Sequence, residues 1–139
     1  MATKVKAKWL HDLRFEGRDP DGQTFEMGPI PDKGKRDALN PMEMLLMAMA
    51  GCTGMDVTHV LEKKRQKVEA LSVEVTGEKM DKTPYTWETI HVKYIVKGNV
   101  SKEAMEHAIK LSMEKYCSCG IMLGATAKIT SEYVIEPSQ

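Results

Sequence analysis

The sequence has few cysteines and few aromatic residues, and it has no excess of charge of either sign. Three cysteines in 139 residues make an odd, small set, which disfavours a secreted domain held together by disulfides. Basic and acidic residues number 20 each, so the formal net charge is zero. Because nucleic-acid-binding surfaces are basic and the arginines here are scattered, we expect no nucleic-acid partner.

The sequence also lacks a recognisable targeting or membrane segment. The first ten residues alternate lysine with small and apolar residues, without the apolar block of about 7–15 residues that a signal peptide carries. The most apolar stretch, residues 42–55, contains Glu43 and is shorter than the roughly 20 residues needed to cross a bilayer. We therefore expect a cytoplasmic protein with no membrane span.

The length of the chain fits one domain over residues 1–139. Alternating apolar residues and turn signals predict strands and loops, while longer periodic segments predict helices. We expect strands near 3–10, 13–17, 23–27, 71–76, 90–96 and 127–135, a loop over 28–39, and helices over 40–66 and 102–116. The sequence therefore predicts an α+β fold.

The helix predicted over 40–66 has the clearest start signal. Asn40 suits the N-cap, Pro41 suits the first helical position, and Glu43 lies three residues after the cap, as in a capping box. From residue 42 to residue 55 this helix is apolar on nearly every side, so we expect it to be buried all round. One domain of this size has little material to surround a helix, so a homodimer is expected.

Cys52 lies in the middle of this helix, where a lone cysteine is most often a small core residue. Asp56 lies one helical turn after it, and an ionisable neighbour is less usual in a pure core. The negative charge of Asp56 would raise the pKa of the thiol unless a cation offsets it. His59 is two turns away and out of hydrogen-bonding reach along a straight helix, which disfavours a Cys-His hydrolase.

Cys117 and Cys119 form a C-x-C after the second predicted helix. A structural metal site needs about four ligands, and no histidine has finger-like spacing to this pair. We therefore expect no metal. On spacing alone, two ordinary buried thiols are the simpler interpretation.

Two motifs carry a resemblance to a known family. Residues 40–56, N-P-M-E-M-L-L-M-A-M-A-G-C-T-G-M-D, resemble the central helix of the OsmC/Ohr family, whose members carry N-P-x-E-L-L and a reactive cysteine twelve residues after the asparagine. Residues 114–120, E-K-Y-C-S-C-G, resemble the family's second cysteine motif. The resemblance implies antiparallel sheets packed around a buried central helix, in an intertwined homodimer with active sites at the subunit interface.

By the same resemblance, Cys52 attacks a hydroperoxide and Cys117 resolves the resulting sulfenic acid as a disulfide. The reductant is then an external dithiol, such as a lipoyl group, and no redox cofactor is required. Methionine and leucine side chains around Cys52 would favour organic hydroperoxides, because a hydrocarbon tail gains free energy by burial among them.

The sequence departs from the family at the groups that activate the thiolate. Ohr-type members carry a glutamate directly after N-P, paired with an arginine from an N-terminal strand, whereas this chain has Met42 there. Arg14 matches the family arginine best, with Arg18 as the second choice. Glu43 fits a capping role, although Glu43 from a partner chain or Asp56 could hold Arg14 instead.

Two questions stay open at this point. Cys119 is either a spectator or an alternative resolving thiol. A different function also fits the many methionines and the missing acid at Met42: a non-catalytic dimer that binds an apolar ligand or senses redox state through a methionine-lined cleft.

Overall fold

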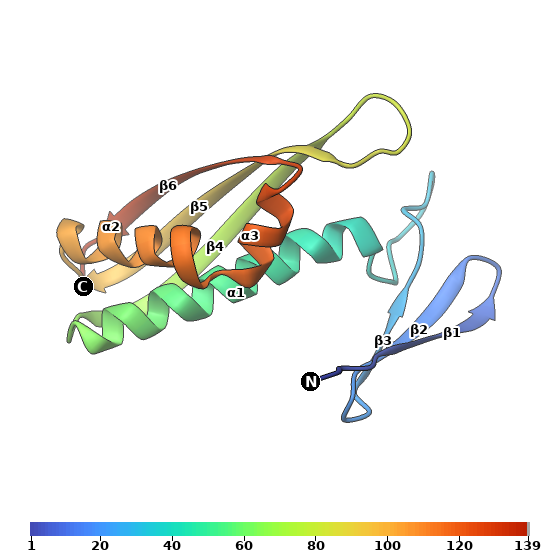
Figure 1. The fold of residues 1–139 in the computed structure, drawn as a ribbon, viewed down its shortest axis with the longest axis horizontal. Coiled ribbons are helices and arrows are strands. Elements are labelled where there is room, and N and C mark those ends of the chain that lie inside the picture. The colour runs from blue at the N-terminus through green and yellow to red at the C-terminus, as the bar shows by residue number, and fades with distance from the viewer. Residues whose placement is uncertain (139) are drawn as a thin grey trace. The chain divides into compact units, whose positions relative to one another are not determined.

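The computed structural model describes residues 1–138, and the chain forms two compact units, Met1–Leu45 and Leu46–Gln139. Each unit contains one three-stranded sheet (Figure 1). The boundary between the units lies near the start of the long helix, and the single domain expected over residues 1–139 stays a prediction.

The first unit is built on an antiparallel meander of β1 (Lys6–His11), β2 (Arg14–Arg18) and β3 (Thr24–Met27). A turn over residues 19–22 joins β2 to β3. The backbone N–H of Gly22, which has a φ of +94°, donates to the carbonyl of Asp19 at 3.1 Å. The Asp19 carboxylate accepts from the backbone N–H groups of Asp21 and Gln23, so this side chain closes the turn as turn aspartates typically do.

Helix α1 (Pro41–Lys63) begins where the sequence predicts. The side-chain oxygen of Asn40 accepts from the backbone N–H groups of Met42 at 3.1 Å and Glu43 at 3.2 Å, which confirms the N-cap. The Glu43 carboxylate pairs with Arg36 at 2.6 Å. Glu43 therefore contacts the preceding loop, which differs from the capping-box contact expected of it.

Helix α1 ends at Lys63, three residues before the predicted end at Gln66. Arg65 has a φ of +56°, and the backbone N–H of Gln66 donates to the carbonyl of Leu61 at 3.0 Å. A left-handed residue followed by such a hydrogen bond is a common way to end a helix. The left-handed position is occupied by Arg65 and not by the glycine that usually marks a helix end, so the sequence gives no signal for the end of α1.

The second unit has a sheet in the order β4 (Lys67–Lys79), β5 (Trp87–Asn99) and β6 (Lys128–Glu136). Strands β4 and β5 are antiparallel, but β5 and β6 are parallel. The implied all-antiparallel arrangement is therefore wrong for β6. The reason is the connection between β5 and β6, which contains helices that return the chain to the end of the sheet where β5 begins.

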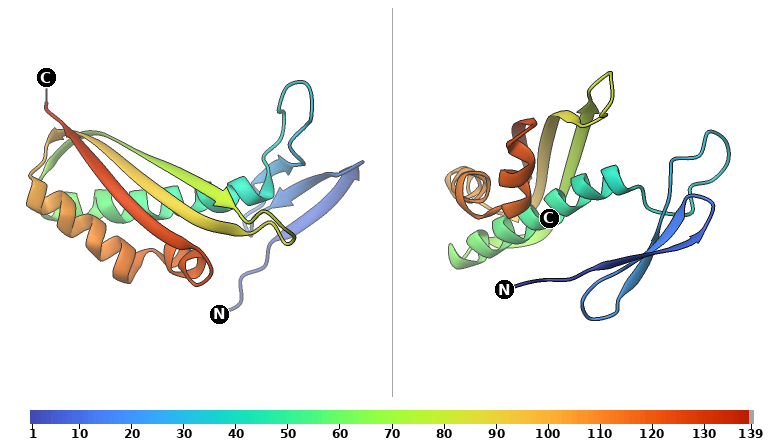
Figure 2. Two further views of the ribbon diagram at one scale, coloured as in Figure 1. Left: turned by 90° about the horizontal axis from the view of Figure 1, so that it is seen from above. Right: turned by 45° about the vertical axis from the view of Figure 1, so that its right-hand side comes forward.

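That connection contains α2 (Lys102–Leu111), a π-helical stretch (Ser112–Tyr116) and α3 (Ser118–Gly124). Ser101 caps α2 by accepting from the backbone N–H of Ala104 at 3.1 Å. The predicted helix over 102–116 thus changes hydrogen-bonding pattern before it ends, and α3 was not predicted as a helix. Within this unit, α1, α2 and α3 lie on the same side of the sheet (Figure 2).

The core of the second unit lies between α1, α2 and the helix-facing side of β5. Alternate β5 residues are fully buried, as the sequence predicts. They are Ile90, Val92, Tyr94 and Val96. From α1, a single stripe joins this core, consisting of Met49, Thr53, Val57, Val60 and Leu61.

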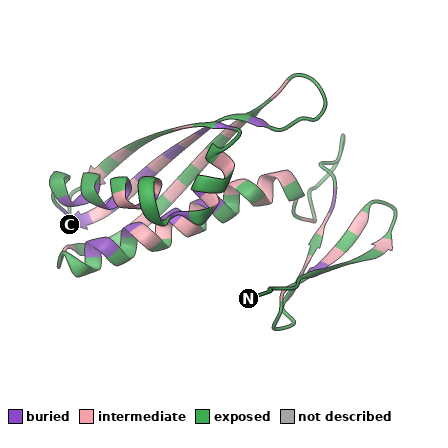
Figure 3. Ribbon diagram, viewed as in Figure 1, coloured by how far each residue is buried: buried purple, intermediate pink, exposed green. Residues whose placement is uncertain are grey.

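Within a single chain, α1 is not buried all round (Figure 3). Leu45, Met47 and Met55 are 42%, 47% and 70% exposed. Burial of these side chains by a partner chain, which the sequence analysis expects of a homodimer, remains a prediction.

Helix α1 is also long and apolar enough, by length and composition, to span a membrane, which corrects the expectation that this segment is too short. Core helices of soluble proteins pass the same test, so one such helix is weak evidence for a membrane. Because α1 packs a stripe of side chains into the core of the second unit, we describe it as a core helix.

Candidate functional site

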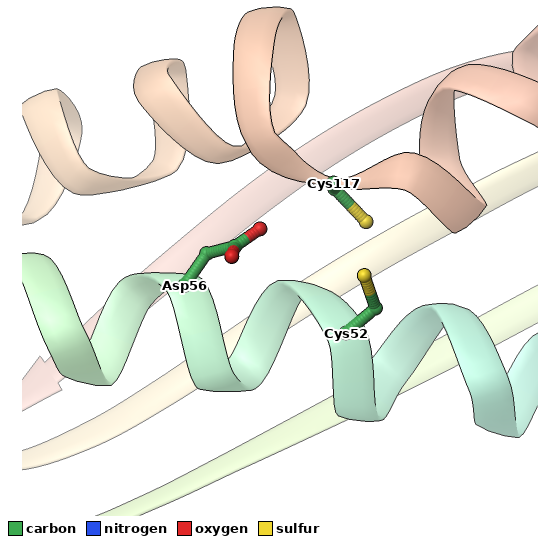
Figure 4. Close-up of side chains that lie close together, drawn as sticks. All are labelled: Cys52, Asp56 and Cys117. Atoms are coloured by element: carbon green, nitrogen blue, oxygen red, sulfur yellow. The ribbon is translucent and has the colours of Figure 1, made fainter. Parts of the chain in front are cut away.

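The second unit brings Cys52, Asp56 and Cys117 together (Figure 4). The sulfur atoms of Cys52 and Cys117 and a carboxylate oxygen of Asp56 all lie within 4.8 Å of one another. Cys52 and Asp56 come from consecutive turns of α1, whereas Cys117 comes from the start of α3. The two sulfur atoms point toward each other across the space between these elements.

Cys117 is held in place by backbone hydrogen bonds on both sides. Its N–H donates to the carbonyl of Ser112 at 2.7 Å, which ends the π-helical stretch. Its sulfur accepts from the backbone N–H of Gly120 at 3.2 Å, so the cysteine side chain caps α3. A Cβ at Gly120 would lie 3.2 Å from the Cys117 sulfur, so glycine at this position avoids crowding the thiol.

Cys52 is the one of the three thiols whose pKa is lowered. Its pKa is lowered chiefly by a hydrogen bond from the backbone N–H of Cys119, against the opposing effect of burial. The thiols of Cys117 and Cys119 lower it further by hydrogen bonding, and the charge of Asp56 raises it, as the sequence suggested. Cys52 is partly exposed, so its sulfur combines thiolate character with access to solvent.

The other two thiols are shifted in the opposite direction. Burial is the main cause that raises the pKa of Cys117, to about 12, and the side chain is fully buried. The neighbouring Cys52 and Asp56 charges raise it further. Burial also raises the pKa of Cys119. The site therefore pairs one thiol whose pKa lies below the ordinary cysteine value with two thiols whose pKa values lie above it.

A chain of buried hydroxyl groups leads to Asp56. The Tyr94 hydroxyl lies 2.6 Å from the Thr53 hydroxyl, which lies 2.7 Å from the Ser112 hydroxyl. Ser112 donates to Oδ2 of Asp56 at 2.9 Å. With the carboxylate ionised, each hydroxyl donates to the next one toward Asp56, so the donor directions follow from the acceptor at the end of the chain.

This hydroxyl chain was not predicted. Thr53 looks like a helical neighbour of Cys52, and Tyr94 looks like an ordinary core residue of a strand. Ser112 gives the only visible signal, because it follows Ala104 and Ala108 at four-residue spacing on the inner face of the second helix. A polar residue on an apolar face needs a hydrogen-bond partner there.

A pocket of about 650 Å³ opens beside Asp56. Val60, Leu111 and Tyr116 contribute apolar walls, while basic side chains from α1 and α2 also line it. No methionine is among its lining residues, so the pocket at the site differs from the methionine-lined cleft expected from the sequence.

Arg14 and Glu43 both belong to the first unit. Arg14 donates to Glu26 at 2.9 Å and to Asp37 at 2.7 Å, two carboxylates that the sequence analysis did not single out. These hydrogen bonds raise its pKa further above its ordinary value. In this chain the pairs are therefore Arg14 with Glu26 and Asp37, and Glu43 with Arg36.

The three clustered ligand atoms could also hold a metal ion, without the histidines considered in the sequence analysis. Three ligands are one short of a closed zinc site. Such an ion would bind the Cys52 sulfur and compete with any reaction of that thiolate.

Comparisons with known proteins agree on one family. The sequence model of a family described as OsmC-like protein matches residues 33–132. Protein YhfA of Escherichia coli strain K12 is 37% identical over 134 residues, which cover 95% of this chain and 97% of that protein. A hypothetical protein of known structure from Aquifex aeolicus VF5 is 34% identical, with a TM-score of 0.83 and 98% of both chains covered.

More distant solved structures share the fold. An OsmC like protein from Mycoplasma pneumoniae is 14% identical, with a TM-score of 0.84 and 98% of both chains covered. The organic hydroperoxide resistance protein OhrB of Bacillus subtilis is 16% identical, with a TM-score of 0.66 over 96% of this chain and 98% of that one. At such low sequence identity, the structural similarity shows a shared fold and nothing about function.

Proposed function

We propose, from the premise that the chain belongs to the OsmC-like family, that it is a thiol-dependent enzyme that reduces organic hydroperoxides. One observation carries the proposal: two thiols with opposite pKa shifts lie with their sulfur atoms within 4.8 Å of each other. Cys52 is the nucleophile, because its pKa is lowered and its side chain is partly exposed. Cys117 is the resolving thiol.

In the first step, the Cys52 thiolate attacks the distal oxygen of the hydroperoxide. A sulfur–oxygen bond forms and the oxygen–oxygen bond breaks, so the sulfur is oxidised to a sulfenic acid. The bonding electrons leave with the alkoxide, which takes a proton from solvent and becomes the alcohol. In the second step, Cys117 displaces the oxygen as water and forms a disulfide with Cys52. An external dithiol, such as a lipoyl group, then reduces the disulfide, and no redox cofactor takes part.

An organic substrate is favoured by the pocket beside Asp56, because Val60, Leu111 and Tyr116 offer apolar surface to a hydrocarbon tail. Because the proposed reaction starts from reduced thiols, we assign the enzyme to the cytoplasm, where thiols are kept reduced. The proposal also includes Arg14 as a cation that assists ionisation of Cys52, since a guanidinium keeps its charge when desolvated.

The test is an anaerobic thiol titration before and after one equivalent of cumene hydroperoxide, with the alcohol product measured. Wild-type protein should lose two thiols and release one equivalent of alcohol. Cys52→Ser should release none, because the nucleophile is gone. Cys117→Ser should release one equivalent and retain a sulfenic acid that dimedone traps.

Cys119→Ser is the matched control, because it removes a third thiol of the site but keeps the backbone N–H that donates to Cys52. It should behave nearly as wild type. Loss of turnover in this variant would assign the resolving role to Cys119. If wild-type protein releases no alcohol, the peroxidase proposal is wrong, and a non-catalytic protein that binds an apolar ligand or senses redox state becomes the better explanation.

A further inference from the structure

The resolving step needs a base that the proposed roles of the cysteines do not supply. Cys117 has to lose its proton as it attacks, yet its side chain is fully buried, and burial, the largest cause of its raised pKa, persists after Cys52 has been oxidised. Before the reaction, the Cys52 thiolate accepts a hydrogen bond from Cys117. After the first step that thiolate has become an uncharged sulfenic acid, so it no longer provides a negatively charged base beside Cys117.

Asp56 is the carboxylate that remains. One of its oxygens lies within 4.8 Å of both sulfur atoms, and the carboxylate points into the space between α1 and the Cys117 segment (Figure 4). Among the residues the structure describes, Cys52 and Asp56 are the two charged groups that act on the ionisation of Cys117. With Cys52 oxidised, Asp56 is the base left beside the resolving thiol.

The hydroxyl chain holds this carboxylate in place. Ser112 donates to Oδ2, and Ser112 is itself fixed by Thr53, which bonds to Tyr94. Ser112, Thr53 and Tyr94 are all fully buried, so these contacts cannot be exchanged easily for water. Ser112 occupies one acceptor site of the carboxylate, so other acceptor sites of Asp56 stay open to a proton from Cys117.

We propose, on the basis of the peroxidase function proposed above, that Asp56 is the general base of the resolving step. Its carboxylate accepts the proton from the Cys117 sulfur while that sulfur attacks the sulfur of Cys52. Ser112, Thr53 and Tyr94 are positioning residues that keep the carboxylate oriented. The proposal rests on the position of the partly buried Asp56 carboxylate, which has an oxygen within 4.8 Å of both reacting sulfur atoms.

The step balances without another reagent. The sulfur–sulfur bond forms as the sulfur–oxygen bond of the sulfenic acid breaks, and the bonding electrons leave with the oxygen. The Cys117 sulfur is oxidised and the Cys52 sulfur is reduced, each to the disulfide level. The proton passes from Cys117 to Asp56 and then to the departing hydroxide, which leaves as water and restores the carboxylate.

The experiment separates the two steps in a single turnover. Reduced full-length protein is mixed with one equivalent of cumene hydroperoxide, and samples are quenched over time for alcohol and for disulfide. Asp56→Asn keeps the shape and an oxygen that can accept from Ser112, but it cannot act as the base. Glu62→Gln makes the same chemical change at an exposed position of α1 and is the matched control.

Asp56→Asn should release alcohol at least as fast as wild type, because the charge that raises the pKa of Cys52 is gone. Its disulfide formation should be slower by tenfold or more, as expected for loss of a general base, and dimedone should trap the accumulated sulfenic acid. Asp56→Glu should recover part of the rate, and Glu62→Gln should match wild type in both steps. In wild type, D₂O should slow disulfide formation more than alcohol release.

Unchanged disulfide formation in Asp56→Asn, with normal alcohol release, would overturn the role of Asp56 and leave the peroxidase function intact. Equal slowing of both steps would show a structural role and would also overturn it. Absence of alcohol from wild-type protein would overturn the peroxidase function and this inference together. Should Asp56→Asn fail to fold, the D₂O measurement on wild type decides, since an equal isotope effect on both steps contradicts proton transfer in resolution.

Discussion

Thr53→Val removes the central hydroxyl of the buried chain that positions Asp56, and we expect it to destabilise the protein. Thr53 is fully buried, with hydrogen bonds to Tyr94 at 2.6 Å and Ser112 at 2.7 Å. Each lost hydrogen bond costs about 1 kcal/mol net, and a buried Tyr94 hydroxyl without a partner costs about 1–3 kcal/mol more. Valine has nearly the same shape and one more buried methyl group, which returns about 1 kcal/mol. The free energy of unfolding should therefore fall by about 2–4 kcal/mol.

The assay is urea unfolding of reduced protein at one fixed protein concentration, because assembly would make the stability depend on concentration. Thr53→Ser is the control, since it keeps the hydroxyl and loses one methyl group. It should cost only about 1 kcal/mol. Tyr94→Phe completes a double-mutant cycle, in which the double variant with Thr53→Val should lose less than the sum of the single losses by about 1 kcal/mol or more.

Two results would refute the reasoning. If Thr53→Val costs no more than Thr53→Ser, the hydroxyl is not held by the contacts that the structure shows. If the losses of Thr53→Val and Tyr94→Phe simply add, the two hydroxyl groups do not stabilise each other. Either result would also weaken the case that this chain orients Asp56.

Three further predictions concern the ionisation of the thiols, the role of Arg14 and the assembly. Alkylation of Cys52 should rise with pH through a midpoint below the ordinary cysteine value, because its pKa is lowered, whereas Cys117 should stay unmodified until strongly alkaline pH, because its pKa is about 12. Mass spectrometry of the alkylated sites would check this order. In Arg14→Ala the Cys52 midpoint should rise by about one pH unit or more; an unchanged profile with full peroxidase activity removes Arg14 from the mechanism. Analytical ultracentrifugation should find a homodimer, since Met55 and its apolar neighbours on α1 are exposed in one chain. We expect the dimer interface to bury well over about 2,000 Å². A stable monomer at micromolar concentration contradicts the homodimer.

Local chemistry explains which elements the sequence predicts well. Asn40 and Ser101 each cap a helix with hydrogen bonds to residues two or three positions away, so the helix starts follow from neighbouring residues. The end of α1 does not, because Arg65 takes a left-handed conformation with no glycine to signal it. The parallel pairing of β6 depends on how α2 and α3 return the chain, and that path is a tertiary property.

In the candidate site too, some features follow from the sequence and others depend on the tertiary structure. Cys52 and Cys117 were assigned from their motifs, and the structure brings their sulfur atoms close together. Their opposite pKa shifts could not be predicted, because one comes from the backbone N–H of Cys119 and the other from burial. The placement of Ser112 against Asp56 likewise depends on how the π-helical stretch packs on α1.

The position of Asp56 makes sense only when both steps of the proposed reaction are considered. For the first step its charge is unfavourable, because it raises the pKa of the Cys52 nucleophile. The hydrogen bonds from the Cys119 backbone and from two thiols outweigh that effect, so Cys52 still ionises more readily than a free cysteine. For the second step the same charge is useful, because the buried Cys117 thiol needs a base at a moment when Cys52 has lost its charge. A site that carried out the first step alone would react faster without this carboxylate, so the presence of Asp56 beside both sulfur atoms favours a reaction that continues to the disulfide.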